Sequence, residues 1–220
     1  MTTENEDLLK VYFPDLTLEM KSKLLKLQEL YLHWNNQINV ISRKDIDELM
    51  IRHVLHSLAL QKFIALRTGT EIMDLGCGGG FPGIPLAIVF PETQFLLVDS
   101  IEKKIKVVAE IAQALNLKNV TTKHARAEEI KHQFDFVVSR AVAPLEQLLF
   151  WTYKKYKKLN SNEKINGLIC LKGGDLHQEI SDAHNYLKAS RITPNIQLTN
   201  ISNYYTEDFF ETKKIVYVGM

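Results

Sequence analysis

A glycine-rich segment carries the clearest chemical signal in the chain. Four glycines, Gly76, Gly78, Gly79 and Gly80, follow a short apolar run and precede a helix that opens near Pro82. Glycine permits positive φ angles and a close approach of the backbone to a ligand. The free N–H groups and positive dipole end of the following helix favour polar or anionic groups. The segment predicts a strand, a tight turn and a helix start that together hold a cofactor.

A carboxylate follows the next expected strand. The segment 94–98 is strand-like, and Asp99 ends it, 23 residues after Gly76. A carboxylate at this place can accept hydrogen bonds from both ribose hydroxyls of an adenosine-containing cofactor. The segment 78–83 also fits the dinucleotide fingerprint G-x-G-x-x-G, which keeps a nicotinamide or flavin enzyme open as an alternative. Because the strand abuts Gly76 rather than Gly78, the dinucleotide alternative is the weaker one.

The elements that must position these residues alternate between strand and helix after residue 69. Five strands are expected at 71–75, 94–98, 120–124, 134–138 and 167–171, with helices between them. Strands separated by helices predict a parallel sheet covered on both faces, hence an α/β fold. Two further strands, 196–199 and 214–218, have no helix between them and predict an antiparallel hairpin at the sheet edge.

The first 68 residues have a different, helical pattern. Thr17 is a candidate N-cap for a helix with a broad apolar stripe, and Ser42 can start a second helical region. We therefore expect two parts, an N-terminal helical extension at 1–68 packed on a main domain at 69–220. His53 and His56 interrupt the apolar side of the second helical region, and each is by itself weak evidence for a site.

Composition narrows the class of protein. The chain has 220 residues, 45% hydrophobic and 24% charged, with a formal net charge of +1. We expect a cytoplasmic protein without a signal peptide or membrane span, because no apolar stretch is long enough. Cys77 and Cys170 are too few for a disulfide framework and lack metal-ligand spacing, so no metal site is expected.

Local basic clusters suggest contact with nucleic acid. Aromatic residues interleave with lysines at 153–158, a pattern that can bind phosphates and stack on bases. Taken alone, that cluster is better explained as a solvated helix end, where lysines are common. We expect one basic face, made from the N-terminal segment and this cluster. The candidate RNA-binding residues are Asn39, Arg43, Lys44, Arg52, His53, Lys154, Lys155, Lys157 and Lys158.

Read from Gly76, the glycine turn resembles the first motif of S-adenosylmethionine-dependent methyltransferases of Rossmann-like type. More narrowly, several short motifs resemble the ribosomal small-subunit methyltransferase G family, also called glucose-inhibited division protein B. In chain order they are Asn39-Val40, the segments 52–58 and 74–87, Asp99-Ser100, Ser139-Arg140-Ala141 and Leu171-Lys172-Gly173. The continuation Phe81-Pro82-Gly83-Ile84-Pro85 is far more specific than the glycines.

The resemblance implies a Rossmann-like methyltransferase fold with a mostly parallel seven-stranded sheet. It implies methylation of N7 of one guanine in 16S ribosomal RNA, with S-adenosylmethionine as cofactor. The implied partner is this RNA or the small ribosomal subunit or its precursor, bound by a monomer. Residues expected at the cofactor, from the glycine and acid pattern together with the resemblance, are Gly76, Gly78, Gly80, Phe81, Asp99, Ala127, Glu128 and Arg140.

Two positions depart from the family pattern. His56 stands where an aspartate is expected, and Glu211-Thr212-Lys213 stands where the family often has Arg-His. The first departure puts a catalytic role for that helix position in question.

The residues also agree with a ring-nitrogen target. Neither cysteine lies in a context suited to nucleophilic attack on a pyrimidine carbon. Guanine N7 carries a lone pair and no proton, so an enzyme has only to align it with the methyl group. We expect Arg140 to act by positioning, with no general base. A small-molecule methyltransferase, with the helical segment as a lid, and a nicotinamide-dependent oxidoreductase stay open as alternatives.

Overall fold

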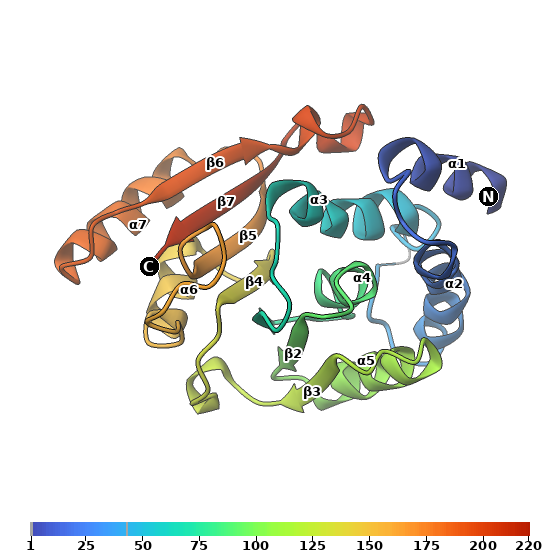
Figure 1. Ribbon diagram of the computed structural model, residues 1–220, viewed down its shortest axis with the longest axis horizontal. Helices are drawn as coiled ribbons and strands as arrows, with labels where there is room; N and C mark the ends of the chain where they lie inside the picture. The colour runs from blue at the N-terminus through green and yellow to red at the C-terminus, as the bar shows by residue number, and fades with distance from the viewer. Residues whose placement is uncertain (1, 43) are drawn as a thin grey trace.

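The computed structural model describes residues 2–42 and 44–220 and shows an α/β fold around a seven-stranded sheet (Figure 1). The strand order is β3-β2-β1-β4-β5-β7-β6, and β1 to β5 are parallel. The strands are β1 Glu71–Leu75, β2 Gln94–Asp99, β3 Val120–His124, β4 Phe136–Arg140, β5 Gly167–Gly173, β6 Ile196–Asn200 and β7 Lys213–Gly219. The predicted parallel sheet with an antiparallel edge hairpin is confirmed, because β7 pairs antiparallel with both β5 and β6.

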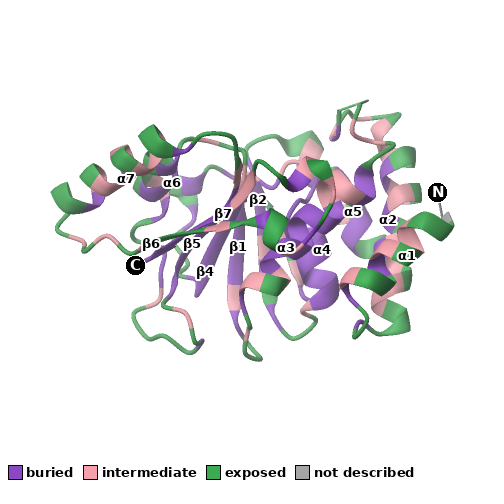
Figure 2. Cartoon of the chain, turned by 90° about the horizontal axis from the view of Figure 1, so that it is seen from above, coloured by how far each residue is buried: buried purple, intermediate pink, exposed green. Residues whose placement is uncertain are grey.

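Helices cover both faces of the sheet, as a parallel sheet requires. The helices are α1 Thr2–Tyr12, α2 Leu18–Asn35, α3 His56–Phe63, α4 Gly83–Val89, α5 Glu102–Ala114, α6 Leu145–Thr152 and α7 His177–Ala189. The side chains of α6 and α7 pack on one face, and those of α2 to α5 pack on the other. Figure 2 shows the buried central strands between these two layers. None of the described helices has the length and apolar character needed to span a bilayer.

Two element boundaries differ from the sequence prediction. The fourth strand runs from Phe136 to Arg140, two residues later than expected, because Ser139 and Arg140 still pair with β5 while Phe134 makes only an isolated bridge to Tyr156. The helical region predicted from Ser42 is wrong at its start. Residues 44–48 form turns, and Ser42 hydrogen bonds to Asp45 locally instead of capping a helix.

The chain between these turns and α3 forms a π-helix, Met50–Leu55. π-helical turns are rare and disturb the regular i to i−4 hydrogen-bond ladder. Here the carbonyl of Arg52 accepts a hydrogen bond, at 3.3 Å, from the side chain of Arg140 at the carboxyl end of β4. The unusual helix therefore supplies a backbone acceptor to the end of β4.

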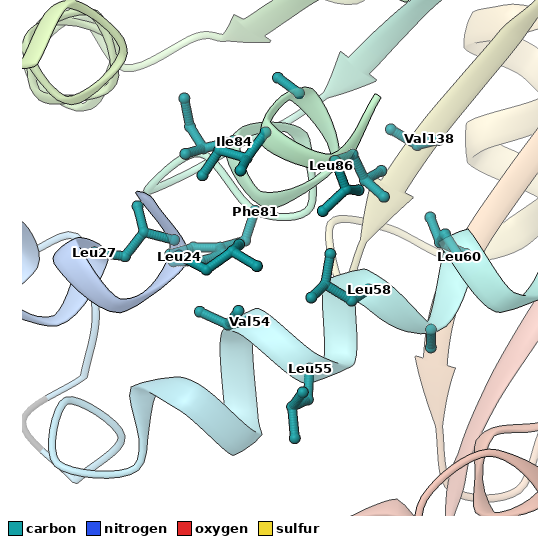
Figure 3. Close-up of a cluster of buried hydrophobic side chains, with 14 of the residues drawn as sticks. Leu24, Leu27, Val54, Leu55, Leu58, Leu60, Phe81, Ile84, Leu86 and Val138 are labelled. Carbon is teal, nitrogen blue, oxygen red and sulfur yellow. The ribbon is translucent and has the colours of Figure 1, made fainter. Parts of the chain in front are cut away.

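The N-terminal helices share a core with the sheet. Thr17 caps α2 as predicted, its hydroxyl accepting from the Met20 N–H at 3.2 Å. Figure 3 shows how Leu24 and Leu27 of α2 lie near Phe81 and Ile84 of the glycine-loop region. Burial of each such side chain stabilises the fold by roughly 1.5 to 3 kcal/mol. The helical segment is thus packed directly behind the glycine turn.

Tyr31 is the polar link in this contact. Its ring is fully buried and lies 4.8 Å from the ring of Phe81, and its hydroxyl donates to the carbonyl of Gly79. Gly79 is itself buried, so its carbonyl depends on this one side chain rather than on water. A single hydrogen bond thus ties α2 to the glycine turn.

Tyr31→Phe tests this link. Removing the hydroxyl leaves the buried Gly79 carbonyl unpaired, so we expect the free energy of unfolding to fall by about 1 to 3 kcal/mol. Denaturant unfolding followed by circular dichroism measures the change. Tyr153→Phe is the matched control, because Tyr153 is exposed and its change should stay within about 0.5 kcal/mol. Equal stability of the two variants would show that the bond contributes nothing.

Candidate functional site

The glycine loop follows β1 and turns sharply at the carboxyl end of the sheet. The N–H groups of Gly76 and Cys77 both donate to the carbonyl of Val98, at 2.8 and 3.0 Å. Gly76, Gly78 and Gly80 have φ angles of 68°, 55° and 96°, a region that strongly favours glycine. A Cβ added at Gly76 would lie 2.6 Å from the side chain of Val142, whereas one added at Gly78 would meet no atom within 4 Å. Gly78 therefore borders open space.

Asp99 closes the other side of that space. One carboxylate oxygen accepts from the Gly78 N–H at 2.9 Å, and the other accepts from the Ile101 N–H at 2.8 Å. The side chain is 8% exposed. Each carboxylate oxygen can accept a second hydrogen bond, so Asp99 can hold the loop and still bind hydroxyl groups of a ligand.

A cavity of about 410 Å³, here called the first cavity, lies at the carboxyl ends of β1, β2 and β4. This is the switch point of the sheet, where ligands of open α/β folds bind. Six of the predicted cofactor residues line it: Gly76, Gly78, Asp99, Ala127, Glu128 and Arg140. The sequence had placed these residues on four separate segments, and the fold brings them together.

Two of the predicted cofactor residues lie elsewhere. Gly80 and Phe81 are buried behind the loop and do not line the first cavity. The Phe81 ring packs 4.9 Å from His53, and the guanidinium carbon of Arg140 lies 5.1 Å from the ring centroid. Phe81 supports the side chains that face the cavity.

Arg140 is the charged residue at the centre of the site. Its guanidinium donates to Nδ1 of His53 at 2.8 Å and to the carbonyl of Arg52 at 3.3 Å. Burial lowers the pKa of Arg140 to about 10, which leaves it charged at neutral pH. Burial, and then the Arg140 charge, lowers the pKa of His53 to about 3. His53 is therefore neutral and accepts from the arginine, which fixes the guanidinium plane.

A second carboxylate lies behind the glycine loop. Asp74 is fully buried, and one of its oxygens accepts from the Gly83 N–H at 2.7 Å. Its other oxygen has no hydrogen-bond partner among the described residues. Burial raises the pKa of Asp74 to about 7, against the opposing effects of the Gly83 bond and the Arg140 charge. Asp74 joins β1 to the start of α4 rather than facing the first cavity.

A second cavity, of about 690 Å³, opens beside the first. Arg140, Ala141 and Val142 line both cavities, so the two meet at the carboxyl end of β4. The rest of its wall combines cationic, acidic and ring-bearing side chains. Among them are Asp45, Arg52, His53, His56, Lys172, Glu179, Phe209 and Lys213.

An ion pair shapes the segment between the cavities. Lys172 is paired with Glu179 and donates to the carbonyl of Ala143 at 2.6 Å. Glu179 accepts from the Leu145 N–H at 2.6 Å. Together these bonds hold the 141–145 segment after β4 in place, so that Ala141 and Val142 form the boundary between the two cavities.

The predicted single basic face is not what the structure shows. Lys155 is buried and bonded to the carbonyl of Ile130, and Lys157 is paired with Glu71 at 2.6 Å and Asp135. Glu71 and Asp135 lie at the amino ends of β1 and β4, whereas the cavities lie at the carboxyl ends of the strands. Lys154 and Lys158 are exposed at that same far edge.

Of the other predicted RNA-binding residues that the structure describes, Arg52 and His53 line the second cavity. Asn39 and Lys44 are exposed on the turns after α2, and Arg43 lies outside the described residues.

Sequence reasoning did not assign Lys172, Phe209 or Lys213 to the site. Lys172 was visible as a polar residue near the end of the fifth strand, where parallel strands present functional groups. Phe209 and Lys213 carry no such signal, since Phe209 lies in a short 3-10 helix and Lys213 begins the antiparallel strand β7, and only tertiary packing brings both to the cavity. No cluster of three or more metal-ligating side chains occurs within 2–42 and 44–220.

Comparison with solved structures agrees with the fold. An S-adenosylmethionine-dependent methyltransferase from Aquifex aeolicus superposes with a TM-score of 0.56 at 16% identity, over 81% of this chain and 98% of that chain. TYW2 from M. jannaschii, solved in complex with AdoMet, gives a TM-score of 0.57 at 14% identity, over 83% and 78% of the two chains. The Rossmann-like methyltransferase fold is confirmed.

Comparison of sequences is more specific. A protein of Bacteroides fragilis named ribosomal RNA small subunit methyltransferase G is 53% identical over 96% of this chain and 98% of its own length. The protein of the same name from Flavobacterium psychrophilum is 52% identical over 98% of both chains. Residues 20–201 match the family described as rRNA small subunit methyltransferase G. Since these matches span nearly the whole chain, the chain belongs to the rRNA small subunit methyltransferase G family.

Proposed function

We propose that this protein transfers a methyl group from S-adenosylmethionine in the first cavity to N7 of a guanine in the small-subunit (16S) ribosomal RNA, held in the second cavity. One observation carries the proposal: Arg140, Ala141 and Val142 line both cavities, so two ligands would meet at the end of β4. Membership of the methyltransferase G family supplies the reaction class and the RNA.

The first cavity fits the cofactor. The open space at Gly78 leaves room for the backbone to approach a ligand, and Asp99 retains lone pairs for ribose hydroxyls. Ala127 and Glu128 extend the wall away from the loop, where the base of an adenosine group would lie. When bound, S-adenosylmethionine supplies an electrophilic methyl group on a sulfonium centre.

The protein's own side chains then have to position the acceptor and exclude water. His53 cannot act as a base near neutral pH, because its pKa is about 3 and Arg140 already occupies Nδ1. Neither cysteine can attack, since both are buried and burial raises the pKa of Cys170 to about 12 and that of Cys77 well above its usual value. A ring nitrogen with a free lone pair needs neither group.

The mouth of the second cavity suits a nucleic acid. Arg52 and Lys213 lie over the Phe209 ring, at 5.3 and 4.7 Å from its centroid. Cations beside an aromatic ring are a common arrangement for phosphate contact next to a base. The helical segment 1–68 supplies Arg52 and His53 to this mouth. A monomeric, cytoplasmic enzyme stays our prediction.

The direct test is methyl transfer to ribosomal RNA. Small-subunit RNA and assembled subunits from cells lacking this enzyme are incubated with labelled S-adenosylmethionine and the protein. We expect one labelled nucleoside, 7-methylguanosine, after nuclease digestion and mass spectrometry. Labelling of RNA at another atom, or of small molecules instead of RNA, would contradict the proposal.

Gly78→Ala tests the placement of the cofactor. The added methyl group enters the open space of the first cavity, and the positive φ adds strain of about 1 to 2 kcal/mol. We expect S-adenosylmethionine affinity to fall at least about tenfold in calorimetry. Gly69→Ala is the matched control, because Gly69 also has positive φ and open space but lies before β1. The Gly69→Ala variant should lose a similar amount of stability while keeping its full affinity for S-adenosylmethionine.

The RNA-binding side is tested by charge removal at the two sheet edges. Arg52→Gln with Lys213→Gln removes two cations at the second cavity, whereas Lys154→Gln with Lys158→Gln removes two at the far edge. We expect only the first pair to make the negative slope of log affinity against log salt less steep, by about 1.4 for two lost phosphate contacts. Filter binding of the RNA over a salt series measures the slopes. A larger change in the second pair would place the RNA at the opposite edge.

A further inference from the structure

His56 has a polar atom that the packing of the chain leaves without a partner. The residue is 6% exposed and belongs to the wall of the second cavity. Its Nε2 is buried and has no hydrogen-bond partner among the described residues. Leaving a buried nitrogen unpaired is unfavourable, so its presence beside a cavity calls for a ligand that pairs with it.

The protonation state of His56 follows from its other nitrogen. The backbone of Arg52, one turn earlier, acts to raise the pKa of His56, as a carbonyl does when it accepts from an imidazole N–H. We assign this N–H to Nδ1, because Nε2 has no hydrogen-bond partner among the described residues. Burial, followed by the charges of Arg140 and Lys213, holds the pKa of His56 well below its usual range. The ring is neutral, and Nε2 is a bare acceptor.

The two carboxylates of this cavity wall each have hydrogen-bond donors within the protein. Asp45 accepts from the Ser42 hydroxyl at 2.6 Å and is paired with Arg52 at 3.3 Å. Glu179 accepts from Lys172 and from the Leu145 N–H. His56 differs from both carboxylates, because its Nε2 is buried and has no donor among the described residues.

Guanine presents complementary chemistry at its two long edges. O6 and N7 are acceptors on one edge, while N1–H and the N2 amino group are donors on the other. If N7 points to the boundary with the first cavity, the donor edge points into the second cavity. Adenine differs there, because its N1 is a bare acceptor.

We propose that Nε2 of His56 accepts a hydrogen bond from the N1–H or N2–H donor edge of the target guanine and so selects guanine over adenine. The inference rests on the proposed function and assigns a specificity role within it. Adenine N1 would set one lone pair against another, leaving both atoms unpaired in a buried site, which is a strong basis for rejection.

Access to Nε2 requires a side chain to move, and Phe209 is placed to do so. Its ring packs nearly perpendicular to the imidazole, with centroids 5.5 Å apart, and lines the same cavity. Arg52 and Lys213 lie over this ring. RNA phosphates that paired with these two cations would remove two of the contacts that hold the Phe209 ring.

The experiment measures kcat/KM with RNA that carries guanosine, inosine or 2-aminopurine riboside at the methylated position. Inosine lacks the N2 amino group, and 2-aminopurine lacks N1–H. For the native protein we expect at least one analogue to lower kcat/KM about tenfold, as for one lost hydrogen bond. In His56→Phe that penalty should disappear, because the acceptor is gone. His56→Gln, which can place an amide oxygen near Nε2, should restore part of it.

The outcomes separate the two proposals. A penalty of the same size in the native protein and in His56→Phe overturns the role of His56 while leaving N7 methylation intact. If neither analogue lowers kcat/KM of the native protein, the role of His56 is overturned without any variant. Failure of the native protein to methylate guanosine-containing RNA would instead refute the proposed function. Cofactor affinity and thermal unfolding of each variant verify that the fold is unchanged.

Discussion

The pairing of the Arg140 guanidinium with His53 and with the Arg52 carbonyl is the contact on which the rest of the site depends. It joins the end of β4 to the π-helix that precedes α3. A buried guanidinium needs partners for its donors, and a neutral imidazole and a backbone carbonyl satisfy two of them without adding a second charge. The cation therefore keeps its charge at the boundary between the two cavities.

The π-helix explains how a helical segment outside the main sheet becomes part of the site. In a regular α-helix the Arg52 carbonyl would be occupied by an N–H four residues later. Here the backbone N–H of His56 donates to the carbonyl of His53 instead, and the Arg52 carbonyl accepts from the side chain of Arg140. Behind it, Phe81 and Tyr31 link the same segment to the glycine turn. The two cavities are thus positioned by one continuous set of contacts from α2 to β4.

The sequence predicted the sheet and the first cavity well because both depend on local patterns. Apolar runs, the glycine turn and Asp99 are short-range signals, and parallel strands bring their carboxyl ends together whatever lies between them. The sequence did not predict the turns after Ser42 or the π-helix, because the same residues also fit the periodicity of a regular helix. The contact between Arg52 and Arg140 is a tertiary contact that this periodicity does not contain. The prediction that Lys155 and Lys157 belong to an exposed basic face failed for a related reason. Lys155 donates to a backbone carbonyl and Lys157 is paired with Asp135, and the sequence does not distinguish such lysines from exposed ones.

The separation of the two sheet edges has a practical consequence for biophysical work. Both cavities open at the carboxyl edge, while Leu159 lies near the opposite edge and is 85% exposed to solvent. Both native cysteines are buried, so Leu159→Cys would offer maleimide reagents a single accessible thiol. A fluorophore or a surface tether attached there would lie at the edge opposite the cavities. It would leave the carboxyl edge free for a large ribonucleoprotein.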